Sequence, residues 1–186
     1  MNDDPTFLTG QLLIAMPSMG DQRFSQSVIC ICNHDETGAL GLVINMPISG
    51  VKFADLAEQL ELGEVTRDVP VRAGGPVERN RGFLLHDDGF YLPDVTVEVT
   101  DGLSMTTTLE ALQQVARGEG PEDALLCLGY SGWGPGQLER ELQDNAWLTV
   151  EATPELVFSN PEGAWMAAIA AIGIDPRLLS AEGGQA

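Results

Sequence analysis

Residues 124–147 read Ala-Leu-Leu-Cys-Leu-Gly-Tyr-Ser-Gly-Trp-Gly-Pro-Gly-Gln-Leu-Glu-Arg-Glu-Leu-Gln-Asp-Asn-Ala-Trp. The uncharged run Ala124 to Leu128 predicts a buried strand, and Pro135 to Asp144 predicts a helix with proline in its first turn. Between them, Ser131-Gly132-Trp133-Gly134 predicts a tight turn. Glycines at 129, 132, 134 and 136 suit a backbone with positive φ or in close contact with another group. A strand, a glycine-rich turn and a helix start also form the layout that binds anions or exposes a nucleophile.

Other stretches predict short strands and amphipathic helices. Strands are expected at Leu12 to Met16, Val28 to Cys32, Leu40 to Ile44, Val69 to Arg72, Gly82 to Leu85, Phe90 to Leu92, Val95 to Val99 and Trp147 to Ala152. Helices are expected between the cap Ser49 and Gly63, from Thr108 to Arg117, as a turn or short helix at Pro154 to Phe158, and after Ser159-Asn160-Pro161-Glu162. Because the strands form hairpins and do not alternate with helices, the pattern favours an α+β fold over a doubly wound α/β sheet.

The chain is strongly acidic. Its 186 residues suit one domain, expected to span 1–186 with flexible ends at 1–9 and 180–186. There are 28 acidic residues and nine basic ones, which gives a net charge of −19. Such a field repels phosphate backbones and argues against direct nucleic-acid binding. The same charge favours a protein partner with a basic surface.

The cysteines and the first residues indicate a cytoplasmic protein. Cys30, Cys32 and Cys127 lie in apolar runs and predict small buried side chains, since no further Cys or His pair stands at zinc-site spacing. The first apolar run, Leu12 to Met16, is far shorter than the roughly 20 residues of a membrane span. We therefore expect a cytoplasmic location, no membrane association and no bound metal or cofactor.

Ser131 is the candidate nucleophile of the glycine-rich stretch. A nucleophile elbow needs Gly-x-Ser-x-Gly, and residues 129–133 supply all of it except the last glycine, which is replaced by Trp133. A base would have to be His34 or His86, the two histidines of the chain. The alternative interpretation is that Ser131 bonds the local backbone.

Two phosphate-binding motifs fail in the same stretch. Gly129 and Gly134 have P-loop spacing, but Pro135-Gly136 replaces the Lys-Ser/Thr pair, and Gln137 replaces the third glycine of a dinucleotide loop. An anion could still bind the backbone amides at the start of the predicted helix. The alternative is that the glycines allow the turn to pack closely around Trp133.

The segment Arg67 to Arg81 is locally basic and surrounds Ala73-Gly74-Gly75-Pro76. Its arginines would supply positive charge to the glycine-rich turn if the two segments folded side by side. They could instead neutralise neighbouring acids on the surface. Similarly, His34-Asp35 and His86-Asp87 could form a divalent cation site if their turns met, or could be solvated hairpin turns.

Four blocks of the sequence closely resemble the bacterial AlgH/YqgE family. They are Gly10-Gln-Leu-Leu-Ile-Ala-Met-Pro17, Gly38-Ala-Leu-Gly-Leu-Val-Ile-Asn45, Gly74-Gly-Pro-Val77 with Arg81-Gly-Phe-Leu-Leu-His86, and Tyr130-Ser-Gly-Trp-Gly-Pro-Gly-Gln-Leu-Glu139. The resemblance covers nearly the whole chain in the same order. It implies a single-domain α+β fold in which mixed strands include a small closed barrel surrounded by helices.

The resemblance also implies a regulatory role, because members of the family are described as candidate transcriptional regulators. It implies no established catalytic activity. Many relatives carry alanine in place of Ser131, which weakens a mechanism built on its hydroxyl. We therefore expect a non-enzymatic regulatory or protein-interaction role, with a small-anion-binding protein or a hydrolase using residues 129–137 as the alternative. The candidate binding residues are Ser131, Gly132, Trp133, Gly134, Gly136, Gln137, Gly74, Gly75, Arg72, Arg79 and Arg81.

Overall fold

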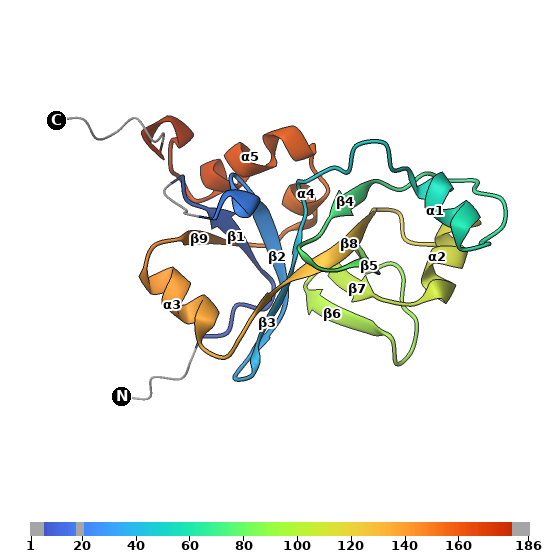
Figure 1. Ribbon diagram of the computed structural model, residues 1–186, viewed down its shortest axis with the longest axis horizontal. Helices are drawn as coiled ribbons and strands as arrows, with labels where there is room; N and C mark the ends of the chain where they lie inside the picture. Colours follow the sequence, from blue (N-terminus) through green and yellow to red (C-terminus); the bar gives the residue numbers. More distant parts are fainter. Residues whose placement is uncertain (1–5, 18–20, 180–186) are drawn as a thin grey trace.

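The computed structural model describes residues 6–17 and 21–179, and a mixed sheet of nine strands runs through them (Figure 1). The strand order is β6-β7-β5-β8-β3-β2-β1-β9, with β4 beside β8. All pairs are antiparallel except β4 with β8, which are parallel. The strands are β1 Gln11–Ala15, β2 Val28–Asp35, β3 Gly38–Val43, β4 Val71–Ala73, β5 Val77–Asp87, β6 Thr96–Thr100, β7 Leu103–Thr106, β8 Ala124–Trp133 and β9 Trp147–Glu151.

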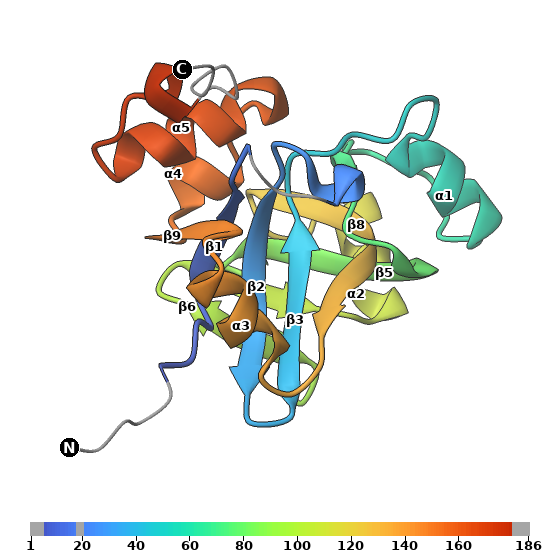
Figure 2. The ribbon, with the colours of Figure 1, turned by 60° about the vertical axis from the view of Figure 1, so that its left-hand side comes forward.

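Strand β8 belongs to both halves of the sheet. Its first half pairs with β5 and β4, so that Leu126 lies opposite Leu84 and beside Val71. Its second half pairs with β3, where Ser131 lies opposite Gly41. Because β8 changes partners along its length, the sheet curls, and Figure 2 shows β2 and β3 crossing in front of β5.

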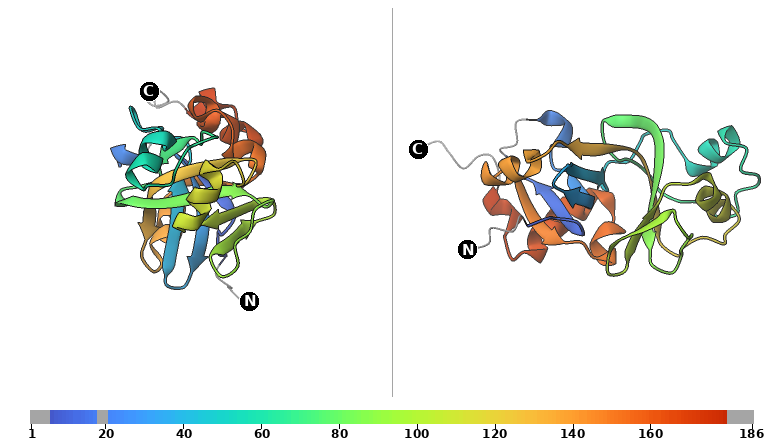
Figure 3. Two further views of the ribbon diagram at one scale, coloured as in Figure 1. Left: turned by 90° about the vertical axis from the view of Figure 1, so that its right-hand side faces the viewer. Right: turned by 90° about the horizontal axis from the view of Figure 1, so that it is seen from below.

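The α+β class expected from the sequence is confirmed. The resemblance implied a small closed barrel, and the described strands curl into a half-barrel with β6 and β9 at its two edges. Helices cover the sheet on both sides, as the views along and across the molecule show (Figure 3).

Three apolar clusters hold these layers together. The largest lies inside the curl and joins Leu12, Cys30 and Leu85 to Trp165 of α5 (Ala164–Ala171). A second packs α1 (Phe53–Gln59) and α2 (Leu109–Ala116) on the outer face of β5 and β8. The third packs α3 (Gln137–Gln143) on the outer face of β1, β2 and β3. The hairpin of β2 and β3 is thus covered on both faces, as expected from its uninterrupted apolar run.

The helix starts follow local capping rules. Helix α2 begins after Thr108, whose Oγ1 accepts a hydrogen bond from Ala111 N at 3.3 Å. Helix α1 begins after Lys52, not Ser49, because Asp55 accepts the Lys52 backbone N–H at 3.1 Å. The remaining helical segments are α4 Pro154–Val157 and the 3₁₀ turns η1 Gln22–Phe24, η2 Pro161–Gly163 and η3 Pro176–Leu179.

One strand prediction is wrong, and one strand was missed. Residues 90–92, expected as a strand, form no strand and lead from β5 into β6. Strand β7 was not predicted, because Leu-Ser-Met-Thr at 103–106 has a short and weak strand pattern. The predicted flexible ends fall partly outside the described residues, since residues 1–5 and 180–186 are not described and residues 6–9 are.

Candidate functional site

The glycine-rich stretch is mostly strand, which corrects the expected turn at 131–134. Strand β8 continues to Trp133 because β3 pairs with it there, with Trp133 opposite Ala39. The turn follows at residues 134–136, and α3 begins after Gly136, so Pro135 precedes the helix and does not occupy its first turn. Gln137 Oε1 accepts the Gly134 N–H at 3.0 Å. The Gly134 amide is thus bonded to the helix itself and is not free to bind an anion.

The glycines of the two predicted segments pack directly on one another. A Cβ built on Gly74 would overlap Gly129 O, and one built on Gly75 would overlap the backbone of Tyr130. A Cβ on Gly129 would lie 2.6 Å from Gly75 O. Glycine is required at these positions for close backbone approach. The Gly74-Gly75 turn therefore lies beside the second half of β8. This proximity was the condition under which the arginines of segment 67–81 could supply positive charge to the glycine-rich stretch.

Ser131 has the geometry of a structural residue. Its side chain is buried, and its Oγ donates to Gly74 O at 3.4 Å. Neither histidine is its hydrogen-bond partner, so the described structure contains no serine-histidine pair. The hydrolase alternative therefore lacks its essential contact.

His34 ties the first residues of the described chain to α3. Its Nδ1 accepts the Leu8 backbone N–H at 2.9 Å, so Nε2 carries the proton and donates to Glu139 Oε1 at 2.7 Å. The Glu139 carboxylate is partly desolvated, which alone would raise its pKa, but the hydrogen bonds from its own backbone N–H and from His34 outweigh this effect and lower it. Both nitrogens of His34 are therefore engaged in holding the structure.

His86 is fully buried in a separate hydrogen-bond chain. Its Nδ1 donates to Asp87 O at 2.6 Å, so Nε2 accepts from Thr106 Oγ1 at 2.8 Å. Burial lowers its pKa below the usual value, against the opposing effects of Asp87. The turns of His34 and His86 do not meet, and within residues 6–17 and 21–179 no three His, Cys, Asp or Glu side chains are placed to hold a metal.

The cysteines are buried, as expected, and lie free among the apolar side chains inside the curl. Burial raises the pKa of Cys127 to about 12, with a further contribution from Cys30. A thiol held protonated in this way is a poor nucleophile.

Trp133 is 7% exposed and belongs to the core on the α3 side of the sheet. Its Nε1 donates to Glu141 Oε2 at 2.7 Å, and Trp147 Nε1 donates to the same oxygen at 3.0 Å. Gln137 Nε2 reaches the other oxygen of Glu141 at 3.4 Å. One carboxylate of α3 thus fixes both indole rings against the sheet.

The three candidate arginines have three different environments. Arg72 is buried, donates to the carbonyl oxygens of Ile44 and Val71, and has its pKa lowered by burial. It holds β4 in place and is not on the surface, which corrects its assignment as an accessible binding residue. Arg81 pairs with Glu78 at 3.3 Å and lies over the Phe83 ring. Arg79 is exposed and forms no ion pair within the described chain.

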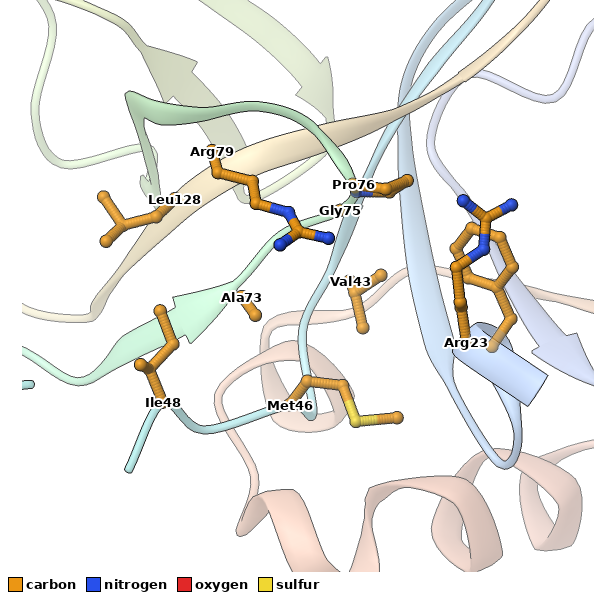
Figure 4. A pocket seen from close by; sticks show the side chains of 10 residues that line it. Arg23, Val43, Met46, Ile48, Ala73, Gly75, Pro76, Arg79 and Leu128 are labelled. Atoms are coloured by element: carbon orange, nitrogen blue, oxygen red, sulfur yellow. The ribbon is translucent and has the colours of Figure 1, made fainter. Parts of the chain in front are cut away.

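An open pocket lies between the Gly74-Gly75-Pro76 turn and the loop after β3; we name it the Met46 pocket (Figure 4). Its volume is about 320 Å³, at the low end of the range of ligand pockets. Figure 4 shows guanidinium groups on two sides of an apolar floor. The lining residues are Arg23, Phe24, Val43, Met46, Ile48, Ala73, Gly75, Pro76, Arg79 and Leu128.

A second pocket of about 390 Å³ adjoins it, and we name it the Trp133 pocket. The two share Arg23, Phe24 and Pro76, so together they form one groove, called here the Pro76 groove. The Trp133 pocket is lined by Asp21, Arg23, Phe24, Pro76, Val77, Gly132, Trp133, Gln137, Glu141, Ala146 and Trp147.

The groove contains several predicted residues and several that were missed. Of the candidates, Gly75, Arg79, Gly132, Trp133 and Gln137 line it, whereas Arg72, Gly74 and Ser131 are buried beside it, and Gly134, Gly136 and Arg81 do not line it. Arg23, Phe24 and Met46 were missed. An Arg-Phe pair in an otherwise polar loop was the available signal, but its place in the same groove as Pro76 depends on the tertiary fold. Among the described residues, no helix combines the length and the apolar character required to cross a bilayer.

Comparisons with known sequences cover almost the whole chain. A family model described as AlgH-like matches residues 12–177. A UPF0301 protein from Paracoccus denitrificans is 49% identical over 189 residues, covering 99% of this chain and 100% of its own length. A UPF0301 protein from Nitrobacter hamburgensis is 48% identical over 193 residues, covering 98% of this chain and 89% of its own.

Two solved structures resemble the fold over most or all of the chain. The solution structure of the AlgH protein from Pseudomonas aeruginosa matches with a TM-score of 0.78 and 43% identity, and covers 100% of both chains. A crystal structure of a Corynebacterium diphtheriae protein matches with a TM-score of 0.71 over 87% of this chain and 85% of that one, at 23% identity. The second likeness concerns the fold alone. Neither name states an activity.

Proposed function

The chain belongs to the AlgH-like family, and we propose that it is a non-catalytic regulatory protein that acts by binding a protein partner in the Pro76 groove. A cytoplasmic location, expected from the sequence, is part of the same proposal. The proposal does not include direct contact with nucleic acid, because a net charge of −19 repels phosphate groups.

One observation carries the proposal. The serine and the two histidines considered as catalytic groups are bonded inside the fold, whereas the groove presents arginine, aromatic and apolar side chains to solvent. Ser131 and His86 are buried and hydrogen-bonded, and His34 is engaged at both nitrogens. In contrast, Arg23 and Phe24 form the shared wall of two open pockets. Arginine and aromatic side chains are enriched at protein interfaces, and they provide most of the binding energy there.

The net charge of the whole protein acts on a partner at longer range than the side chains of the groove do. A partner with a basic surface remains our expectation for the acidic surface as a whole, since opposite charges speed encounter. This expectation is separate from the chemistry inside the groove, where Arg79 supplies positive charge and Arg23 is paired with Asp21.

A filled groove tests the proposal. Ala73 is half-buried in the wall of the Met46 pocket, and Ala73→Leu would occupy part of the pocket. Ala170→Leu makes the same substitution on the exposed face of α5, outside the groove. Trp133→Ala is a poor probe because it removes a core side chain, at a cost of about 3–5 kcal/mol in the free energy of unfolding.

We expect wild type and Ala170→Leu to capture the same protein from cell lysate at moderate salt, and Ala73→Leu to lose it. Thermal unfolding midpoints of the three proteins would confirm that they are folded. The proposal is wrong if Ala73→Leu is folded and captures the same protein as wild type, or if wild type captures nothing above an uncoupled matrix.

A further inference from the structure

Strand β5 carries an exposed segment with no regular partner strand. Val77 pairs with Tyr130 of β8, and the next pair along β5 is Gly82 with Leu128. Residues 78–81 therefore face only Gly129 on that side. On the other side, β7 pairs with β5 only from Leu84 onward. We call residues 78–81 the β5 bulge; all four of its side chains are exposed.

Arg79 is the uncompensated charge of this region. Arg23 is held by Asp21 at 2.8 Å, and Arg81 is held by Glu78 at 3.3 Å. Arg79 forms no such pair in the part of the chain that the structure describes. Figure 4 shows its guanidinium directed into the space bounded by Ala73, Gly75 and Val43. A guanidinium in this position can donate two parallel hydrogen bonds to a carboxylate.

Apolar pockets lie on both sides of Arg79. One is the Met46 pocket. The other, which we name the Leu56 pocket, has a volume of about 260 Å³ and lies between α1, α2 and the β5 bulge. Arg79 and Leu128 line both of them. The Leu56 pocket is otherwise formed mainly by apolar side chains, and Leu60 at its rim is 45% exposed.

We infer that the β5 bulge binds an extended acidic segment of a protein partner, with a carboxylate on Arg79 and apolar side chains in the Met46 and Leu56 pockets. In an extended strand, alternate side chains point the same way and lie about 7 Å apart. The segment therefore carries apolar, acidic and apolar residues at alternate positions. Its backbone is also able to hydrogen-bond to the free edge of β5 beside the bulge, which is a common mode of peptide recognition.

Charge and shape select this ligand over others. A basic segment would place like charge against Arg79. A small inorganic anion would pair with Arg79 but leave both apolar pockets empty. The overall negative charge of the protein opposes an acidic ligand. At physiological ionic strength, however, salt screens charges that lie more than about 8 Å away. The nearby guanidinium of Arg79 therefore dominates the electrostatic interaction with the ligand.

A displayed random dodecapeptide library tests the inference, which rests on the proposed function. We expect selection on the full chain to enrich peptides with the alternating apolar, acidic and apolar pattern. In fluorescence-polarisation titrations, the enriched peptides should bind Arg79→Gln about tenfold more weakly than wild type. Leu60→Gln, at the rim of the Leu56 pocket, should also weaken binding. Arg117→Gln removes the same charge at the exposed end of α2, outside all three pockets, and should bind like wild type.

Other outcomes would overturn the inference. These are no enrichment above an empty matrix, a consensus without acidic residues, equal affinity of wild type and Arg79→Gln, or complete competition by inorganic phosphate at millimolar concentration. Because Arg79 is exposed, loss of folding is not expected to obscure the result. If Ala73→Leu loses the lysate partner while Arg79→Gln retains it, the proposed function stands and the acidic-segment inference fails.

Discussion

Gly75 lies so close to Tyr130 that a Cβ added at Gly75 would overlap the carbonyl carbon and oxygen of Tyr130. Both groups are backbone, so neither can move aside as a side chain would. We therefore expect Gly75→Ala to lower the free energy of unfolding by about 3 kcal/mol, the upper part of the usual range for overpacking. The midpoint of urea denaturation would measure the change.

Gly163→Ala is the matched control for this substitution. A Cβ at Gly163 would meet no atom within 4 Å, and its φ of −98° is accessible to alanine. We expect a change within about 0.5 kcal/mol. Equal midpoints for the two variants would mean that the Gly74-Gly75 turn can shift away from β8 at little cost.

Glu141→Gln tests how the two indole rings are held. The carboxylate oxygen Oε2 accepts hydrogen bonds from both Trp133 and Trp147, and an amide keeps an acceptor but loses the charge. Because hydrogen bonds to charged groups contribute about 1.5–3 kcal/mol, we expect a loss of about 1–2 kcal/mol with a change in tryptophan fluorescence. Glu58→Gln, at an exposed position of α1, should leave both unchanged. Unaltered stability of Glu141→Gln would show that packing alone fixes the rings.

Ser131→Ala should cost less than about 1 kcal/mol. The Oγ hydrogen bond to Gly74 O is long at 3.4 Å, and the same carbonyl already accepts the Val43 N–H at 2.9 Å. Ser131→Leu, in contrast, adds atoms at a site that is 1% exposed and should cost about 1–3 kcal/mol. If Ser131→Ala abolished partner capture while remaining folded, the hydroxyl would have a function that its buried position does not explain.

The sequence predicted elements whose signal is local. The apolar periodicity of Phe53 and Ala57 identified α1, and the uninterrupted runs of β2 and β3 identified a buried hairpin. The strand start at Ala124 was also correct. The path of β8 beyond Gly129 was not predictable locally, because glycines are typical both of turns and of strands in close contact. What decides between them is the opposing backbone of β3 and of the Gly74-Gly75 turn, which is distant in sequence.

The candidate site shows the same division. The sequence left open whether the segment around Gly75 folds beside the stretch around Trp133, and it did not predict the exposure of either residue. The arginines of segment 67–81 are alike in sequence, yet Arg72 is buried and Arg79 is exposed. The reason is that Arg72 lies in β4, whereas Arg79 lies in the exposed bulge of β5. The contribution of Arg23 and Phe24 depends on where the tertiary fold places η1 relative to the groove, which no spacing encodes.

His86 ends a directional chain of hydrogen bonds. Leu92 N donates to Thr96 Oγ1 at 2.9 Å, Thr96 and Thr106 are 2.7 Å apart at their hydroxyl oxygens, and Thr106 donates to His86 Nε2. Since His86 Nδ1 already donates to Asp87 O, protonation of Nε2 would require the Thr106 hydroxyl to turn and accept a hydrogen bond where it now donates one. This geometry and the burial of the ring act in the same direction, and both favour the neutral form.

The stability of the protein should therefore depend on pH through His86. Burial lowers its pKa in the folded state, against the opposing effects of Asp87, while the unfolded chain titrates near 6.5. Below about pH 6.5 the unfolded state binds a proton that the folded state does not, so the stabilisation present above this pH is lost as pH falls toward the folded-state value. The slope for this group is at most about 1.4 kcal/mol per pH unit.

Comparison of wild type with His86→Gln would isolate this effect. Glutamine retains one donor and one acceptor but does not titrate, so we expect it to be less stable than wild type at pH 8 and to lose less stability between pH 6.5 and 5. His34 and the carboxylates are common to both proteins, so their contributions cancel in the difference. Parallel curves from urea denaturation across this range would contradict the prediction, because they would mean that His86 takes up a proton equally in the folded and unfolded states.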